Sequence, residues 1–144
     1  MSRAARARWA RLAWGVLALL ALSLLVTSRI LTPHPRGLGT HVALGLPPCG
    51  FLLAFGLPCP TCGLTTAFAQ LARFELLASV RTHPLGLPLF ALTLVSLPLA
   101  LRNLMRAESP ASALVRMRAE RWALLLGVAL LVTWCTRLAP LLTR

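Results

Sequence analysis

The chain has 144 residues, of which 58% are hydrophobic, and it carries a formal net charge of +12. A chain of this length forms a single domain, which cannot bury so many apolar side chains away from water. The composition therefore excludes an ordinary water-soluble globule. It predicts an all-α integral membrane protein in which residues 1–144 form one membrane domain.

The positive charge is distributed as in a membrane protein rather than as in a nucleic-acid-binding protein. All the basic residues are arginine, and they gather at the ends of the apolar runs, where membrane proteins carry their flanking charges. No interleaving of aromatic and basic residues marks a stacking surface for single strands. We therefore expect the lipid bilayer as a partner and no nucleic acid.

Three apolar runs predict a bundle of about three transmembrane helices. The first covers residues 12–28 and follows a basic arm at 1–11; no small-x-small cleavage site comes after it, so an uncleaved anchor is expected. The second covers residues 84–101, and a membrane helix tolerates Pro88 and Pro98 in its interior because neighbouring groups satisfy the freed carbonyls. The third covers residues 121–142, with Arg137 snorkelling to the interface.

The distribution of arginine also predicts the orientation. The arm at 1–11 and the loop at 102–120 are both basic, and the positive-inside rule places both in the cytoplasm. The segment between the first two spans and the C-terminus then face outward. We expect a multi-pass protein of the bacterial inner membrane, with a cytoplasmic N-terminus and an outward-facing cysteine motif.

The outward segment divides into a loop at 29–62 and a helix at 63–82. Proline and glycine through residues 32–48 predict an irregular loop. The apolar stretch 51–57 is too short to span a bilayer and suits a re-entrant or interfacial turn. From residue 63 the pattern is typical of one helix lying in the membrane interface. The apolar positions at helical spacing are Leu64, Phe68, Leu71, Phe74 and Ala78.

Four cysteines carry most of the available chemistry. Cys59 and Cys62 form a Cys-x-x-Cys pair, Cys49 lies ten residues before it, and Cys135 lies late in the third span. All four fall toward one side of the membrane in either orientation. Thr61 is expected to cap a helix that begins near Cys62. A helix N-terminus stabilises thiolate, which is both the nucleophile and the metal ligand.

These positions leave four interpretations open. Disulfides could pin the outer loop to the bundle, as an oxidising compartment permits. The thiols could hold zinc, could cycle between dithiol and disulfide at Cys59 and Cys62, or could simply pack, as buried free cysteines do. The candidate zinc ligands are Cys49, Cys59 and Cys62, with Cys135, His41 or His83 as a further one.

Few other side chains offer chemistry. His83-Pro84 lies where the interfacial helix meets the second span, and the residue before proline is biased away from helical angles, which predicts a turn. Glu75 is the only acid before Glu108, and it indicates either a break in the helix or exposure at the headgroups. With three acidic residues, no hydrolytic constellation can be assembled, so an enzyme is not the expected function.

The segment around the cysteines resembles the DUF2752 family, small bacterial membrane proteins of unassigned function. The resemblance covers residues 49–89 and rests on Cys49, on the run from Gly56 to Ala67, on Arg73-Phe74-Glu75 and on His83-Pro84-Leu85. Thr66, Arg73-Phe74 and His83 stand where the family has Arg, His-Gly and Asn. The resemblance implies several spans and three grouped cysteines, but no activity. Its motif positions are Pro58, Cys59, Pro60, Cys62, Gly63, Thr65, Glu75, His83 and Pro84.

The working hypothesis is an accessory or scaffold subunit that binds another membrane protein, with structural cysteines holding its outer loop. Small residues in the spans suit helix–helix contact. The alternatives are a membrane thiol-disulfide oxidoreductase that uses Cys59 and Cys62, and a zinc-binding protein that uses Cys49 as well.

Overall fold

The computed structural model describes residues 2–116 and 118–142, and within these ranges it is helical with no strand. Three helices are long and apolar enough to cross a membrane: α1 (Arg3–Ile30), α5 (Gly86–Arg106) and α7 (Ala119–Leu142). The predicted all-α architecture with three membrane-spanning helices and additional helices is confirmed. The shorter elements are η1 (Thr40–Leu44), α2 (Gly50–Phe55), α3 (Leu64–Leu71), α4 (Leu76–Thr82) and α6 (Pro110–Arg116).

The first helix is longer than the uncharged run that predicted it. α1 begins at Arg3 because the Ser2 hydroxyl accepts a hydrogen bond from the Ala5 backbone N–H at 3.2 Å. That bond satisfies one of the donors that a helix N-terminus leaves unpaired. From Arg3 onward, the predicted basic arm is therefore part of the same helix as the first span.

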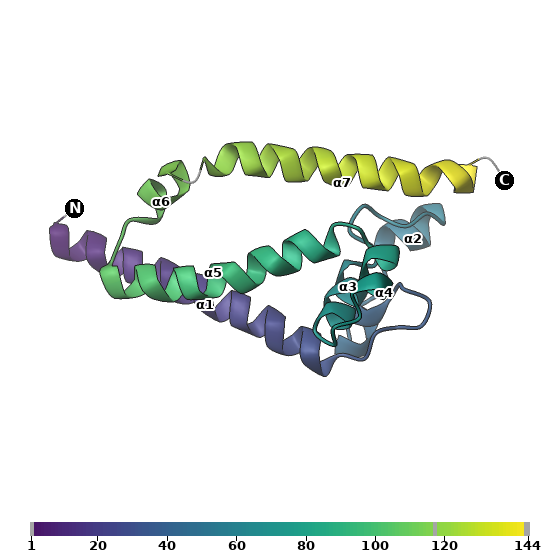
Figure 1. Cartoon of the computed structure of the whole chain (residues 1–144), viewed down its shortest axis with the longest axis horizontal. Coiled ribbons are helices and arrows are strands. Elements are labelled where there is room, and N and C mark those ends of the chain that lie inside the picture. Colours follow the sequence, from purple (N-terminus) through teal and green to yellow (C-terminus); the bar gives the residue numbers. More distant parts are fainter. Residues whose placement is uncertain (1, 117, 143–144) are drawn as a thin grey trace.

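α1 and α5 pack side by side and form the main helix pair (Figure 1). Trp14 and Ala18 of α1 are buried against the fully buried Ala100 of α5, with Leu97 and Leu104 packed around them. Small residues let two membrane helices approach closely, so that van der Waals contact replaces the hydrophobic effect that lipid does not supply.

The two ends of the molecule gather different parts of the chain. The start of α1 and α6 lie at one end, whereas α2, α3, α4 and the end of α7 lie at the other (Figure 1). At the first end, the indole N–H of Trp14 donates a 2.8 Å hydrogen bond to the carbonyl oxygen of Glu108. The described parts of the two basic segments, residues 2–11, 102–116 and 118–120, are thus brought to one end and the cysteine motif to the opposite end.

Residues 63–82 form two helices where the sequence predicted one. α3 ends at Leu71, the chain turns at Phe74 with a φ of 65°, and α4 packs back against α3. Glu75 is the residue that precedes α4, so the predicted alternative of a break forms here. The prediction that Phe74 continues the apolar face of a single helix was wrong, because Phe74 lies in the turn and its side chain is 89% exposed. Helical spacing continues through this turn without a glycine or proline, so periodicity alone does not reveal it.

Arg73 stabilises this turn and joins it to the end of α1. Its guanidinium donates to the carbonyl oxygens of Ala69 at 2.9 Å, Arg29 at 3.2 Å and Ser28 at 3.4 Å. Ser28 and Arg29 lie in the last turn of α1, where carbonyls lack intrahelical partners and the helix dipole favours a cation. The α3–α4 hairpin is thereby fixed at the end of the first span.

The outer loop is attached to α3 by a buried pair of hydroxyls. The Oγ1 atoms of Thr40 and Thr66 lie 2.7 Å apart, and Thr40 Oγ1 also accepts the His34 backbone N–H at 3.0 Å. Thr66 is fully buried, at the position where the family motif has arginine. A threonine here serves the internal packing of the loop, because a buried hydroxyl must find a partner.

α7 stands apart from the α1–α5 pair over most of its length (Figure 1). In its most apolar stretch of 18 residues, within the described part Ala119–Ala139, no residue is buried. Its Trp134 ring meets the Phe51 ring of α2 edge-on, with centroids 6.0 Å apart. The third span is therefore connected to the rest mainly near the cysteine motif.

Candidate metal centre

Three of the four cysteines meet in one cluster. The Sγ atoms of Cys49, Cys59 and Cys62 all lie within 4.8 Å of one another, and those of Cys59 and Cys62 are 3.2 Å apart. The thiols are free, since a disulfide would require a separation of about 2.05 Å. Cys135 is exposed on α7 and does not belong to the cluster.

The local backbone explains how residues ten apart come together. Cys49 is the N-cap residue of α2, and Gly56 ends that short helix with a φ of 68°, in the left-handed region that glycine enters most easily. The chain then returns to a tight turn in which the Cys62 N–H donates to the Cys59 carbonyl at 3.0 Å. This turn places the two thiols of the Cys-x-x-Cys pair side by side.

The expected cap at Thr61 is wrong. α3 begins at Leu64 with Gly63 as its N-cap residue, and Thr61 Oγ1 lies instead 3.3 Å from Cys59 Sγ. Gly63 has a φ of 91°, and a Cβ there would lie 3.1 Å from the Gly37 carbonyl oxygen. A glycine is therefore required at position 63. Because the backbone of Gly63 is left-handed, α3 begins after it, at Leu64, and not near Cys62.

The thiols differ in their acidity. The Leu52 backbone N–H, followed by the Cys62 side chain, lowers the pKa of Cys49 to about 7. Burial, followed by the side chains of Cys59 and Cys49, raises the pKa of Cys62 to about 12. The expectation that a helix N-terminus would favour thiolate at Cys62 is therefore wrong, because desolvation opposes the charge. The more exposed Cys49 is the first of these two to ionise.

Three side chains form hydrogen bonds with alternate backbone carbonyls of the segment 58–62. The indole N–H of Trp134 donates to Pro58 O at 2.8 Å, Arg137 Nη1 donates to Cys62 O at 3.0 Å, and His83 Nε2 lies 3.0 Å from Pro60 O. Trp134 and Arg137 lie one helical turn apart on α7, so they share a face. Neither Trp134 nor Arg137 was predicted from the sequence to contact residues 58–62. Their three-residue spacing near the end of the span was the available signal.

His83 supports the motif from the α4–α5 junction. It is fully buried, and because Nε2 faces a carbonyl, the neutral ring carries its proton there. Its Nδ1 atom is buried and has no hydrogen-bond partner within the described part of the chain, and burial lowers the pKa of this histidine. The turn predicted at His83-Pro84 forms. His83 holds the Pro60 carbonyl and is not part of the thiol cluster.

A cavity of about 280 Å³ opens beside the thiols. Cys49 and Cys62 line one part of it, and His34 and His41 line another. His41 therefore borders the cluster, as one of the predicted further ligands, but its ring nitrogens do not lie within the group of mutually close ligand atoms. The motif positions Thr65, Glu75 and Pro84 are exposed.

Comparisons with known proteins agree with the motif. No curated protein and no solved structure matches the chain. A family model described as "Protein of unknown function (DUF2752)" matches residues 49–97, that is, 49 of the 144 residues. The matched segment begins at Cys49 and includes all three clustered thiols and His83. The family model thus matches the family that the sequence was predicted to resemble, over residues 49–97.

Proposed function

We propose that this protein is a small membrane protein that binds a zinc ion through the thiolates of Cys49, Cys59 and Cys62. The observation that carries the proposal is that all three Sγ atoms lie within 4.8 Å of one another. Thiolates about 2.3 Å from a tetrahedral zinc ion lie about 3.8 Å apart. Small side-chain rotations would bring the cluster to that spacing.

The donor set favours a thiophilic metal ion. Soft thiolates select zinc or cuprous ions over hard, oxygen-seeking cations. A divalent cation would also stabilise the thiolate of Cys62, which burial otherwise keeps protonated. Three protein ligands leave a fourth position, for which the adjacent cavity with His34 and His41 offers room.

The role that we infer for the metal is structural. Cys49 begins α2, whereas Cys59 and Cys62 lie in the turn before α3. A metal ion held by all three would close the intervening loop and would fix it near the end of α7. In one interpretation of the sequence, disulfides held the outer loop; in this proposal a metal ion holds it. The free energy of metal binding would then contribute directly to folding.

Metal analysis of purified protein tests the proposal. We expect about one zinc per chain after purification in detergent and loading with zinc under reducing conditions. Cys49→Ser, Cys59→Ser and Cys62→Ser should each lose it, whereas Cys135→Ser, which removes a thiol outside the cluster, should retain it. The proposal fails if the first three variants bind as much zinc as the protein with all four thiols.

Thiol-disulfide exchange is a second candidate, favoured by the 3.2 Å separation of Cys59 and Cys62. In such a reaction the Cys59 thiolate attacks a partner disulfide and releases one partner thiolate. The Cys62 thiolate then attacks the mixed disulfide, and the partner leaves with both of its sulfurs reduced. Cys62→Ser should trap a mixed disulfide through Cys59. Zinc binding without any trapped partner would favour the metal site.

The role as an accessory subunit and the orientation are further proposals. The exposed apolar side chains of α7, among them Leu124 and Val128, support contact with lipid or with another membrane protein. The gathering of both basic segments at one end supports a cytoplasmic N-terminus in a bacterial inner membrane. Reporter fusions after residues 46 and 108 test the orientation, since the proposal places them on opposite sides.

A further inference from the structure

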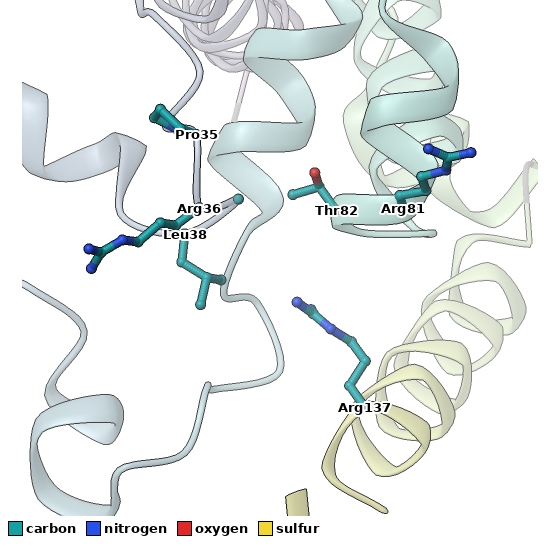
Figure 2. Close-up of a pocket in the computed structure, with 7 residues that line it drawn as sticks. Pro35, Arg36, Leu38, Arg81, Thr82 and Arg137 are labelled. Carbon is teal, nitrogen blue, oxygen red and sulfur yellow. The ribbon is translucent and has the colours of Figure 1, made fainter. Parts of the chain in front are cut away.

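A second cavity, of about 310 Å³, shares Arg36 and Leu38 with the cavity beside the thiols. We call it the arginine pocket, and its lining residues are Pro35, Arg36, Gly37, Leu38, Arg81, Thr82 and Arg137. They come from the outer loop, the end of α4 and α7. Figure 2 shows Arg137 reaching into the space between Leu38 and Thr82. Arg36 and Arg81 lie at opposite sides of that space, and their guanidinium groups point away from it.

The pocket is strongly cationic. Three of its seven lining residues are arginine and none is acidic. Glu75 is the only acid in the chain before Glu108, and among the described residues no ion pair joins Arg36, Arg81 or Arg137 to a carboxylate. The side chains of Arg36 and Arg81 are exposed and that of Arg137 is half-buried, so an anion entering the cavity from solvent would be attracted by three like charges.

Arg137 retains donors that can serve such an anion. Its Nη1 atom donates to the Cys62 carbonyl, but a guanidinium carries five N–H donors in a planar fork. The hydroxyl of Thr82 also lines the pocket. This combination of a planar cation and a neutral hydroxyl suits the oxygens of a phosphate group, which arginine binds in bidentate fashion.

The depth of the pocket indicates where the phosphate is found. Arg137 lies two residues before the end of the apolar stretch Ala119–Ala139, which is the level at which a span meets the lipid headgroups. Arginine at that level is attracted to anionic lipid.

We propose that the arginine pocket binds a phosphate group, held centrally by Arg137 and flanked by Arg36 and Arg81. The phosphate belongs either to an anionic lipid headgroup or to a free phosphate. Through its bond to the Cys62 carbonyl, Arg137 then joins the bound anion to the cysteine motif. The proposal does not depend on zinc, because none of its residues belongs to the thiol cluster.

Lipid retention measured by native mass spectrometry tests the lipid source. The full chain is prepared in mixed micelles of phosphatidylglycerol and phosphatidylcholine, and the bound lipids are counted. The double variant Arg36→Gln/Arg81→Gln should retain phosphatidylglycerol about tenfold more weakly. The matched control Arg102→Gln/Arg106→Gln removes two arginines at the opposite end and should retain it as the unsubstituted chain does. Equal losses in the two variants would show bulk attraction only and would overturn the proposal.

Phosphate titration in phosphatidylcholine micelles alone tests the free source. Saturable binding of inorganic phosphate that is lost in Arg36→Gln/Arg81→Gln identifies a free phosphate. Retention of phosphatidylglycerol against excess phosphate identifies the lipid. Binding of neither overturns the proposal. The variant Arg36→Lys/Arg81→Lys preserves the charge and should restore binding, and unchanged helical circular dichroism in every variant shows that the chain is still folded.

Discussion

The indole nitrogen of Trp134 donates a 2.8 Å hydrogen bond to the carbonyl oxygen of Pro58, and so attaches the last helix to the loop that carries Cys59. The two residues are 76 positions apart in the chain. With the bond from Arg137 to Cys62, it is one of the few connections between α7 and the rest of the described structure.

Trp134→Phe should loosen this attachment while it keeps an aromatic ring against Phe51. Loss of one hydrogen bond, worth roughly 1 kcal/mol, should make opening of the loop about fivefold more frequent. The rate at which a small maleimide labels Cys59 in the metal-free protein measures that opening. Trp122→Phe, which changes an indole that is 63% exposed, is the control. Equal labelling rates in the two variants would contradict the attachment.

His83→Leu should destabilise the folded protein by about 1 kcal/mol, because it leaves the half-buried Pro60 carbonyl without its partner. His83→Gln places an amide N–H near the position of Nε2 and should recover much of the loss. The melting temperature in detergent measures both effects. A glutamine variant no more stable than the leucine variant would show that the hydrogen bond is unimportant.

The same histidine should make stability depend on pH. Burial lowers the pKa of His83 below its ordinary value of 6.5, so the unfolded chain binds a proton that the folded chain refuses. The contribution of neutral, buried His83 to the free energy of unfolding is therefore complete above pH 6.5. It is lost as the pH falls from 6.5 toward the lower pKa that His83 has in the folded chain. The melting temperature of the native chain should fall more between pH 7 and pH 5.5 than that of His83→Gln. Parallel curves would exclude this contribution.

Gly86→Ala should disturb the contact between α3 and α5. An added Cβ would lie 2.6 Å from the Cβ of Ala67, so the helices must separate, at a cost of about 1–3 kcal/mol. Gly127→Ala makes the same substitution where, apart from its own stretch of helix, no described atom lies within 4 Å of the added Cβ, and it should have little effect. Thermal denaturation of the two variants side by side decides the question, and similar melting temperatures would argue against the close approach.

Arg73→Gln should free the end of α1 from the α3–α4 hairpin. It removes charge-assisted bonds to the carbonyls of Ser28 and Arg29, which are worth about 1.5–3 kcal/mol together with their effect on the helix dipole. Arg29→Gln removes a nearby exposed positive charge and leaves those bonds in place. Hydrogen exchange at the last turn of α1 should therefore accelerate in the first variant only. Acceleration in both variants would point to charge alone.

The sequence was most informative where a physical property is additive along the chain. Mean hydropathy over the three apolar runs predicted three membrane-spanning helices, because lipid imposes length and apolarity on any span. The resemblance to the DUF2752 family, carried by Cys49 and by the pair Cys59 and Cys62, implied that these three cysteines lie together. Periodicity failed at Phe74, where the chain reverses without glycine or proline.

What only the tertiary structure decided are the contacts between residues far apart in sequence. The clustering of the Cys49 sulfur with those of Cys59 and Cys62, to the exclusion of Cys135, depends on the short helix α2 and on the turn at Gly56. The sequence by itself determined which residue types are available for chemistry and that three segments are long and apolar enough to cross a membrane. The fold decided which of them meet, because close approach depends on the summed geometry of every turn between them, and local patterns do not encode that sum.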